Sequence, residues 1–225
     1  MKKNIAHIIT LTSLALGLLS IITSFKGQFE VASYLIFGCL FLDVLDGTIA
    51  RYLKTCSEFG KQLDSLSDFI GFGIAPAILM YNFINVEFDN PILSHTTLLI
   101  PIFSALRLAK YNSETTQKKY FTGITTPVNG LLFSALVLIK NQENNLLIST
   151  ILINQCTILI LIVSMSILLI TPIRTFNLRF DELTKDKKKL FFIFISICII
   201  YLFNFTGIPI LILIYVLLSV FKLIN

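Results

Sequence analysis

Four aspartates lie in one short stretch of an otherwise apolar sequence, from Asp43 to Asp68. Asp43 and Asp46 are three residues apart, and Asp64 and Asp68 are four apart, so each pair shares one face if its segment is helical. The positive charge of one arginine, Arg51, cannot balance the negative charge of four carboxylates close to the membrane, but divalent cations can. Ligation by carboxylates alone selects hard ions such as Mg²⁺, Mn²⁺ or Ca²⁺. The stretch therefore predicts a site for one or two divalent cations, an arrangement that suits phosphoryl-type transfer.

Small and basic residues lie between the two aspartate pairs. Gly47 and Ala50 are on or near the face of the first pair, where small side chains let a bulky ligand approach the helix backbone. Arg51 offers two parallel hydrogen bonds to a phosphate. The whole pattern reads D-x2-D-G-x2-A-R-x8-G-x3-D-x3-D, in which the second glycine is Gly60. Acidic residues are common at helix N-termini, so either pair alone is weak evidence. A chance match to the whole pattern has a probability on the order of 10⁻¹⁰ at average residue usage.

Long apolar runs surround the aspartates. The chain has 225 residues, of which 55% are hydrophobic and 14% charged, whereas soluble domains carry about 25% charged residues. A soluble helical bundle would need polar outer faces, which these runs lack. We therefore expect an all-α fold, a polytopic membrane helical bundle of about eight spans, since each run approaches the ~20 residues needed to cross hydrocarbon.

The expected spans cover residues 5–25, 31–45, 69–84, 94–108, 127–139, 146–170, 190–203 and 208–221. The first is long for the apolar region of a signal peptide and has no A-x-A cleavage site, so we expect it to be retained. The run 146–170 is expected to be unbroken. These spans divide the chain into a core of six helices over 1–172, a charged cytoplasmic linker over 173–189, and two additional C-terminal spans over 190–225.

The basic residues predict the orientation of the bundle. If the N-terminus is in the cytoplasm, all but two of the 18 Lys and Arg fall on the cytoplasmic side, and the two exceptions are Lys26 and Lys140. This distribution agrees with the positive-inside rule. The expected topology is N-in and C-in, in the cell (inner) membrane, with the aspartates facing the cytoplasm. The net charge of +5 is thereby explained without nucleic acid as a partner.

The complete pattern resembles, without departure, the signature of the CDP-alcohol phosphatidyltransferase family. This resemblance implies a membrane enzyme, commonly a homodimer, that moves a phosphatidyl group from CDP-diacylglycerol to an alcohol and releases CMP. It implies two divalent cations, Mg²⁺ or Mn²⁺: one held by Asp43, Asp46 and Asp64, the other by Asp43, Asp64 and Asp68. Asp68 would also be the general base. The residues implied to line the CDP site are Gly47, Ala50, Arg51 and Gly60.

Three flanking segments, within residues 5–135, are similar to the serine-specific branch of this family. The matching residues are Thr10, Gly17 and Ser20 in the first span, Arg107, Leu108, Ala109 and Asn112 in SALRLAKYN, and Tyr120, Phe121, Gly123 and Pro127 in YFTGITTP. The chain departs from that branch at His7, Ser13, Lys110 and Ile124-Thr125.

These segments extend the expected site to the acceptor. Ser13 is a polar substitute for an asparagine, and we assign it to the CDP site. Arg107 ends an apolar span on the side of the aspartates, where a guanidinium suits the carboxylate of L-serine. We assign Arg107 and Lys110 to acceptor binding.

Two other functions fit the same residues. Glycerol 3-phosphate is the alternative acceptor, because Arg107, Lys110 and later lysines could bind its phosphate. A cation transporter is the alternative outside this enzyme class, but it predicts acidic residues spread through membrane depth. The acidic residues here gather at one edge.

Overall fold

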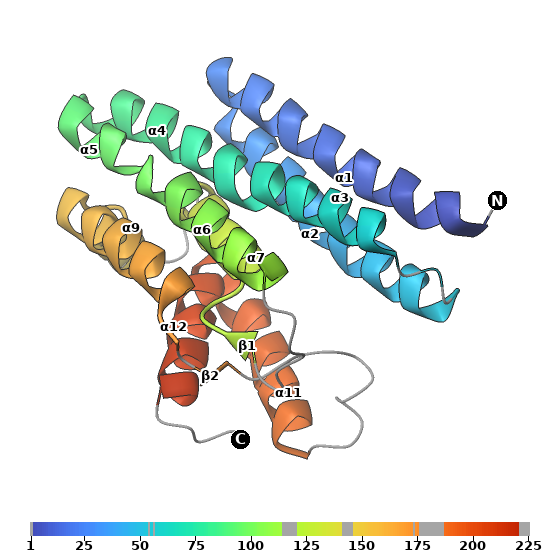
Figure 1. Ribbon diagram of the computed structural model, residues 1–225. Coiled ribbons are helices and arrows are strands. Elements are labelled where there is room, and N and C mark those ends of the chain that lie inside the picture. The colour runs from blue at the N-terminus through green and yellow to red at the C-terminus, as the bar shows by residue number, and fades with distance from the viewer. Residues whose placement is uncertain are drawn as a thin grey trace.

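The computed structural model describes residues 2–53, 55, 57–113, 121–140, 146–172, 174–175 and 187–220. These residues are almost entirely helical (Figure 1). Two strands of two residues, β1 (Phe121–Thr122) and β2 (Arg174–Thr175), pair in antiparallel fashion. The helical elements are α1 (Lys2–Phe25), α2 (Phe29–Tyr52), α3 (Glu58–Asp68), the π-helical segment η1 (Phe69–Ile74), α4 (Ala75–Phe88), α5 (Pro91–Thr96), α6 (Leu99–Ser113), α7 (Thr126–Ile139), α8 (Leu146–Leu152), α9 (Gln155–Ile170), α11 (Lys187–Phe203), the 3₁₀ segment η3 (Asn204–Thr206) and α12 (Gly207–Val220).

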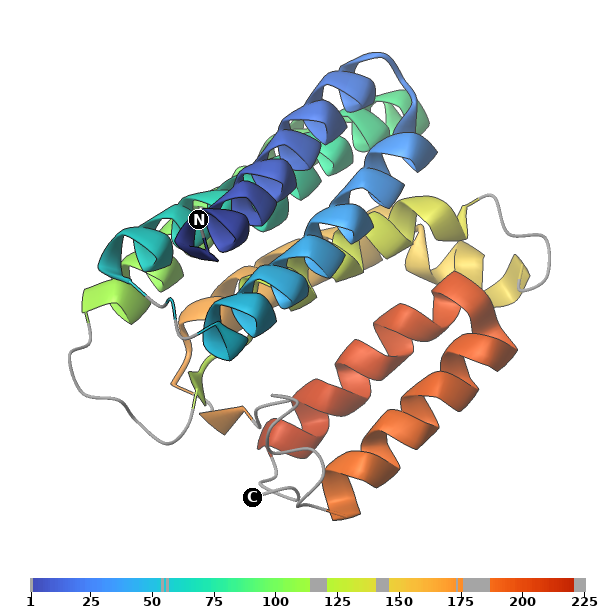
Figure 2. The ribbon, with the colours of Figure 1, turned by 90° about the vertical axis from the view of Figure 1, so that its right-hand side faces the viewer.

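The predicted class, an all-α membrane helical bundle, is confirmed. Four helical stretches among the described residues are long and apolar enough to cross a membrane: 5–25, 58–88, 91–113 and 194–219. Shorter apolar helices cover 126–139 and 155–170. The stretch 194–219 includes a reversal at η3, where Asn204 has a φ of 50°, so α11 and α12 form a hairpin (Figure 2). Most of the expected linker, 173–189, lies outside the described residues.

The first two helices form a long antiparallel pair (Figure 2). Gly27, with a φ of 72°, allows the tight turn between them because glycine adopts this conformation without steric cost. Buried hydroxyls join the two helices, as where Ser20 donates to the Ala32 carbonyl at 2.8 Å. A third helical segment also approaches α1 closely, since a Cβ on Gly17 would lie 3.1 Å from the Cα of Gly71. Small residues permit such close approach between membrane helices.

The segment with the second aspartate pair differs from the expectation. We expected a span over 69–84, directly after this pair, but one continuous helical stretch that includes the pair runs over 58–88. It begins with Ser57 as N-cap, whose hydroxyl accepts a hydrogen bond from the Gly60 amide at 3.1 Å. Directly after Asp68 the helix widens into the π-helical turn η1. Such turns are rare in proteins, and those that occur are often found at functional sites.

The expected unbroken span over 146–170 is wrong. The helix is interrupted at Ile153 and Asn154, and the Asn154 side chain accepts a hydrogen bond from the amide of Cys156 at 2.9 Å to begin α9. A single capping asparagine hardly changes the mean hydropathy of so apolar a run, so hydropathy did not reveal it. The 16 residues of α9 span about 24 Å.

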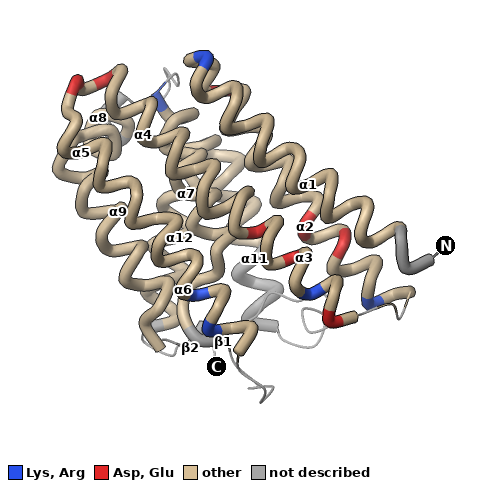
Figure 3. The backbone as a smooth tube through the Cα atoms, turned by 45° about the horizontal axis from the view of Figure 1, so that its top comes forward, with Lys and Arg blue, Asp and Glu red and all other residues tan. Residues whose placement is uncertain are grey.

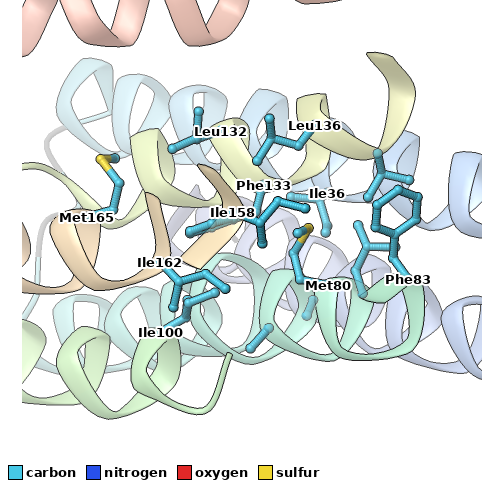
Figure 4. Packing of buried hydrophobic residues seen from close by; sticks show 14 of the residues in the cluster. Ile36, Met80, Phe83, Ile100, Leu132, Phe133, Leu136, Ile158, Ile162 and Met165 are labelled. Carbon is cyan, nitrogen blue, oxygen red and sulfur yellow. The ribbon is translucent and has the colours of Figure 1, made fainter. Parts of the chain in front are cut away.

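The centre of the bundle is α7, which is buried along nearly its whole length. Its Phe133 packs with Met80 of α4 and with Ile158 and Ile162 of α9 (Figure 4). Large apolar side chains are exposed on the outer helices, as expected where lipid replaces water. The acidic residues of α3 and of the C-terminal half of α2 lie in the same half of the bundle as the basic residues of α6 (Figure 3), whereas Glu30 is in the first turn of α2.

Candidate active site

Three carboxylates from two helices meet at one point. Asp43 of α2 and Asp64 and Asp68 of α3 each offer a ligand oxygen, and these oxygens all lie within 4.8 Å of one another. Asp64 and Asp68 face the same way because they are one turn apart. The predicted convergence of two acidic helix faces is therefore seen for three of the four aspartates.

This group fits a hard divalent cation. Its donors are all carboxylate oxygens, the ligands that Mg²⁺ and Mn²⁺ prefer. Like charges this close repel strongly in a partly buried setting, and a bound cation would relieve that repulsion. The three side chains are neither fully buried nor fully exposed, so the group remains open to a ligand.

The fourth aspartate, Asp46, is held by a different contact. Its Oδ2 accepts a hydrogen bond of 2.5 Å from the Oγ1 of Thr10 on α1. Both side chains are buried, each with 5% of its surface exposed. Asp46 lies near enough to Asp64 to interact with it electrostatically, but it is not among the three carboxylates that meet.

Thr10 also connects α1 to α3. Its carbonyl accepts a hydrogen bond of 3.2 Å from the hydroxyl of Ser67, the neighbour of Asp68 in sequence. One residue of α1 therefore contacts both acidic helices at the depth of the aspartates. The sequence matched Thr10 to a family position but gave no indication of this contact, because the partners are 36 and 57 residues away.

The residues expected at the CDP site differ in their surroundings. A Cβ on Gly47 would meet only the Nη1 of Arg51, at 3.6 Å, so the surface beside Gly47 and Arg51 is open. Ala50 is half-buried in the last turn of α2. Gly60 instead lies in a tight contact, since a Cβ there would lie 3.2 Å from the imidazole Cε1 of His7 and 3.2 Å from the Ser57 hydroxyl.

Ser13 lies inside the contact between α1 and α2. Its hydroxyl donates to the carbonyl of Cys39 at 3.2 Å, and the Cys39 thiol donates to the carbonyl of Ser13 at 3.2 Å. With 3% of its surface exposed, Ser13 holds the two helices together one turn before Asp43. Its assignment to the CDP site stays a prediction.

The two expected acceptor residues lie in different environments. Arg107 is buried in α6, and its guanidinium interacts electrostatically with Asp68. Its Nε has no hydrogen-bond partner among the described residues. Lys110 is exposed in the last turn of α6. The structure thus brings Arg107 to the aspartates and leaves Lys110 at the surface.

Two contacts fix α6 against the acidic helix α3. The side-chain amide nitrogen (Nδ2) of Asn112 donates a hydrogen bond to the hydroxyl of Ser65 at 2.9 Å. The ammonium of Lys61 lies over the ring of Tyr111, 5.6 Å from its centroid. Asn112 was matched to the family from the sequence, and these contacts give it a physical role in setting the position of Arg107. Tyr120 of the third matched segment lies outside the described residues.

Fold and site together define a polytopic membrane protein with a carboxylate centre suited to divalent cations. The chain belongs to the CDP-alcohol phosphatidyltransferase family, whose profile matches residues 3–168. It is 35% identical over 175 residues to the CDP-diacylglycerol–serine O-phosphatidyltransferase of Helicobacter pylori, an alignment that covers 77% of this chain and 72% of that protein. It is also similar to the enzyme of the same name from Mycobacterium leprae (34% identity; 59% of this chain, 46% of that protein). The archaetidylserine synthase of Methanothermobacter thermautotrophicus is 38% identical over 54% of this chain and 52% of its own length.

These comparisons identify an enzyme family and remove the support for a cation transporter. The chain spans about half the length of the mycobacterial and archaeal relatives. The matched region contains the three converging aspartates, Thr10 and Arg107, whereas α11 and α12 lie beyond it.

Proposed function

We propose that the protein transfers the phosphatidyl group of CDP-diacylglycerol to L-serine, giving phosphatidylserine and CMP. The observation that carries this proposal is the convergence of Asp43, Asp64 and Asp68 within 4.8 Å in a chain of the CDP-alcohol phosphatidyltransferase family. The names of the three relatives above all specify a serine product or acceptor, which supports serine as the alcohol.

The four aspartates would hold two divalent cations, Mg²⁺ or Mn²⁺. Asp43 and Asp64 would belong to the ligand sets of both cations. Asp46 would complete the set of one cation, and Asp68 would complete the set of the other. When bound, such cations neutralise the charge of the diphosphate and stabilise the departing CMP. The chain's own contribution is to fix the ligands, and the Thr10 hydroxyl fixes the direction of the Asp46 carboxylate.

Asp68 would accept the proton of the serine hydroxyl as that oxygen attacks the phosphorus on the lipid side. Arg107, which interacts with Asp68, would bind the serine carboxylate and so hold the hydroxyl near the base. The open surface beside Gly47 and Arg51 would receive the diphosphate and cytidine. Ala50, Gly60 and Ser13 would shape this CDP site from the surrounding helices.

The arrangement of basic groups favours serine over glycerol 3-phosphate. A phosphorylated acceptor carries a dianion and needs several cations close together. Among the described residues, Arg107 is buried near Asp68, but Lys110 is exposed on the outside of α6. One guanidinium matches one carboxylate, as in serine.

The cellular setting is also part of the proposal. The N- and C-termini and the aspartates would lie on the cytoplasmic side of the inner membrane, a proposal that the distribution of the basic residues supports. There a water-soluble amino acid meets a nucleotide attached to a lipid. The core would be residues 1–172, followed by the linker 173–189 and two spans over 190–225, in a homodimer.

The test is to supply purified protein with CDP-diacylglycerol, Mg²⁺ or Mn²⁺, and one labelled alcohol at a time. Serine, glycerol 3-phosphate, glycerol and inositol would be compared at equal concentration, and label in the lipid fraction would be counted. We expect label from serine. Label from glycerol 3-phosphate and not from serine would overturn the serine assignment and leave the transferase chemistry intact.

A further inference from the structure

Lys61 lies on the face of α3 that carries the second aspartate pair. It precedes Asp64 by three residues and Asp68 by seven, which are one and two helical turns, so the three side chains leave the helix on the same side. Lys61 is about 4.5 Å from Asp64 along the helix axis, towards the start of α3. It is half-buried, and the family signature does not contain it. Lys61 is therefore a basic side chain beside the acidic group that the signature does not account for.

The ammonium of Lys61 is held by the neighbouring helix α6. It lies over the ring of Tyr111, 5.6 Å from the ring centroid, which is within the range of an attractive cation–π contact. Among the described residues it makes no ion pair with Asp64, although a lysine and an aspartate one turn apart on a helix can pair. The positive charge is thus kept next to the aspartates without neutralising one of them.

The position of α6 beside α3 is fixed by two further contacts. Near the end of α6, the Asn112 side chain donates to the Ser65 hydroxyl at 2.9 Å. Near the start of α6, Ser104 lies against η1, because a Cβ placed on Gly73 would lie 3.2 Å from the Cβ of Ser104. The early part of one segment therefore contacts the late part of the other, and α6 runs antiparallel to α3 and η1.

This arrangement creates two layers of polar groups between α3 and α6. Arg107 lies between the two contacts on α6, and Asp68 lies between them on the other segment, in agreement with the electrostatic interaction of these side chains. Tyr111 is one turn beyond Arg107, and Lys61 is two turns before Asp68. Lys61 and Tyr111 thus form an outer layer, which in the orientation proposed above is on the cytoplasmic side of Asp68 and Arg107.

A nucleotide bound at the aspartates would extend towards this outer layer. The acyl chains of CDP-diacylglycerol lie in the membrane, so the nucleotide end of the diphosphate points away from the hydrocarbon. The phosphate that leaves with CMP gains negative charge in the transition state, and a fixed cation beside it stabilises that charge. A lysine ammonium binds a phosphate as a point charge. Lys61 has both the charge and the place for this contact.

We propose that Lys61 binds the phosphate of the departing CMP, and that Tyr111 is a positioning residue that holds the Lys61 ammonium in place. In the transfer step the serine oxygen forms a bond to the phosphorus on the lipid side, and its proton goes to Asp68. The bond from that phosphorus to the bridging oxygen breaks, and the electron pair stays on the CMP phosphate beside Lys61. This inference rests on the proposed function, because it takes a CDP-linked lipid as the substrate.

The test is equilibrium dialysis of full-length variants with labelled CMP in the presence of Mn²⁺. Lys61→Gln removes the charge and Lys61→Arg keeps it, whereas Tyr111→Leu removes the ring and Tyr111→Phe keeps it. The matched control is Lys140→Gln, because the Lys140 ammonium also lies over an aromatic ring, 5.9 Å from the centroid of Phe83. Phe83 is near the opposite end of the helical stretch 58–88 from Lys61. The affinity for Mn²⁺ and the KM for serine are measured for each variant.

We expect the affinity for CMP to fall about tenfold in Lys61→Gln, since a hydrogen bond to a charged group is worth about that factor. Lys61→Arg should largely restore it. Tyr111→Leu should lower it about two- to fivefold, the usual effect of an exposed cation–π contact, and Tyr111→Phe should match wild type. The affinity for Mn²⁺ and the KM for serine should stay within about twofold throughout, and Lys140→Gln should bind CMP as wild type does.

A Lys61→Gln protein that binds both Mn²⁺ and CMP as tightly as wild type would overturn the inference. So would a rise in the KM for serine with unchanged CMP affinity, which would assign Lys61 to the acceptor, or a loss of Mn²⁺ affinity as large as that of CMP affinity, which would indicate a structural role. Because CMP binding is measured without an acceptor, a different acceptor alcohol would leave this test valid. A wild-type protein that binds no CMP would overturn the proposed function itself, and the inference with it.

Discussion

Substitution of Thr10 by valine tests how the protein positions its metal ligands. Valine has nearly the shape of threonine, so packing around this buried position is kept while the donor to Asp46 is lost. The hydrogen bond is short, 2.5 Å, and its acceptor is a carboxylate. Such a bond contributes about 1.5–3 kcal/mol. Because about 1.4 kcal/mol corresponds to a factor of ten in an equilibrium constant, its loss should weaken cation binding about tenfold to a hundredfold.

This magnitude agrees with the usual effect of removing a group that orients a metal ligand, about 10–100-fold. The assay is a titration of purified protein with Mn²⁺, followed by the decrease in the electron paramagnetic resonance signal of the free ion. The activation of serine transfer by Mn²⁺ should move in parallel. Thr10→Ser keeps the hydroxyl and should restore wild-type affinity.

Thr12→Val is the matched control on the same helix. The Thr12 hydroxyl is exposed and donates only to the carbonyl of Ile8 within its own helix, at 2.8 Å, so its loss should leave Mn²⁺ affinity unchanged. A Thr10→Val protein that is folded and binds Mn²⁺ as tightly as wild type would refute the positioning role of Thr10. Equal losses in Thr10→Val and Thr12→Val would indicate a general effect on α1.

Three further predictions concern the base, the backbone and the acidic group. Asp68→Asn should abolish transfer to serine, because an amide cannot accept the proton, while CDP-diacylglycerol binding measured with labelled lipid largely remains; normal turnover would remove Asp68 from the role of base. Gly123→Ala should lower the thermal midpoint strongly, because Gly123 has a φ of 83° and a Cβ there would lie 2.5 Å from the Leu169 carbonyl oxygen. Gly27→Ala, where φ is 72° and nothing lies within 4 Å, should cost only the backbone strain of about 1–2 kcal/mol. Equal decreases of the thermal midpoint in Gly123→Ala and Gly27→Ala would contradict a steric clash at position 123. Removal of divalent cations with EDTA should lower the thermal midpoint, because three carboxylates within 4.8 Å then repel one another, and Mg²⁺ should restore it; an unchanged midpoint would contradict a cation site.

The predictable part of the site depends on local periodicity. Asp64 and Asp68 are one helical turn apart, so their shared face follows from the sequence. The spacing from Asp43 to Asp68 matched a family signature, and the convergence of Asp43, Asp64 and Asp68 agrees with it. The apolar runs likewise predicted a helical membrane bundle, because hydrocarbon permits few other structures.

The features that the sequence did not predict depend on contacts between distant residues. The hydrogen bond from Thr10 to Asp46 joins positions 36 residues apart, and no local pattern encodes it. The interhelical role of Ser13 and the packing of His7 over Gly60 are of the same kind. The interruption at Asn154 was missed for another reason, because one capping side chain is invisible in a hydropathy average.

The number of spans is the weakest prediction from hydropathy. Several helices, such as α7 with 14 residues, are shorter than the ~20 residues that a span needs, so apolar length alone does not distinguish a tilted span from a buried helix. α7 lies at the centre of the bundle and is covered by other helices. Its apolar composition reflects this protein core rather than contact with lipid alone.

The most direct test of the central claim is the release of CMP from CDP-diacylglycerol, measured together with the formation of labelled phosphatidylserine. We predict that CMP and phosphatidylserine appear in equal amounts, that both require serine, and that both stop when EDTA removes divalent cations and resume with Mg²⁺ or Mn²⁺. Formation of CMP at the same rate without serine, or of phosphatidylserine in the presence of EDTA, would contradict a metal-dependent phosphatidyl transfer to serine at the aspartates.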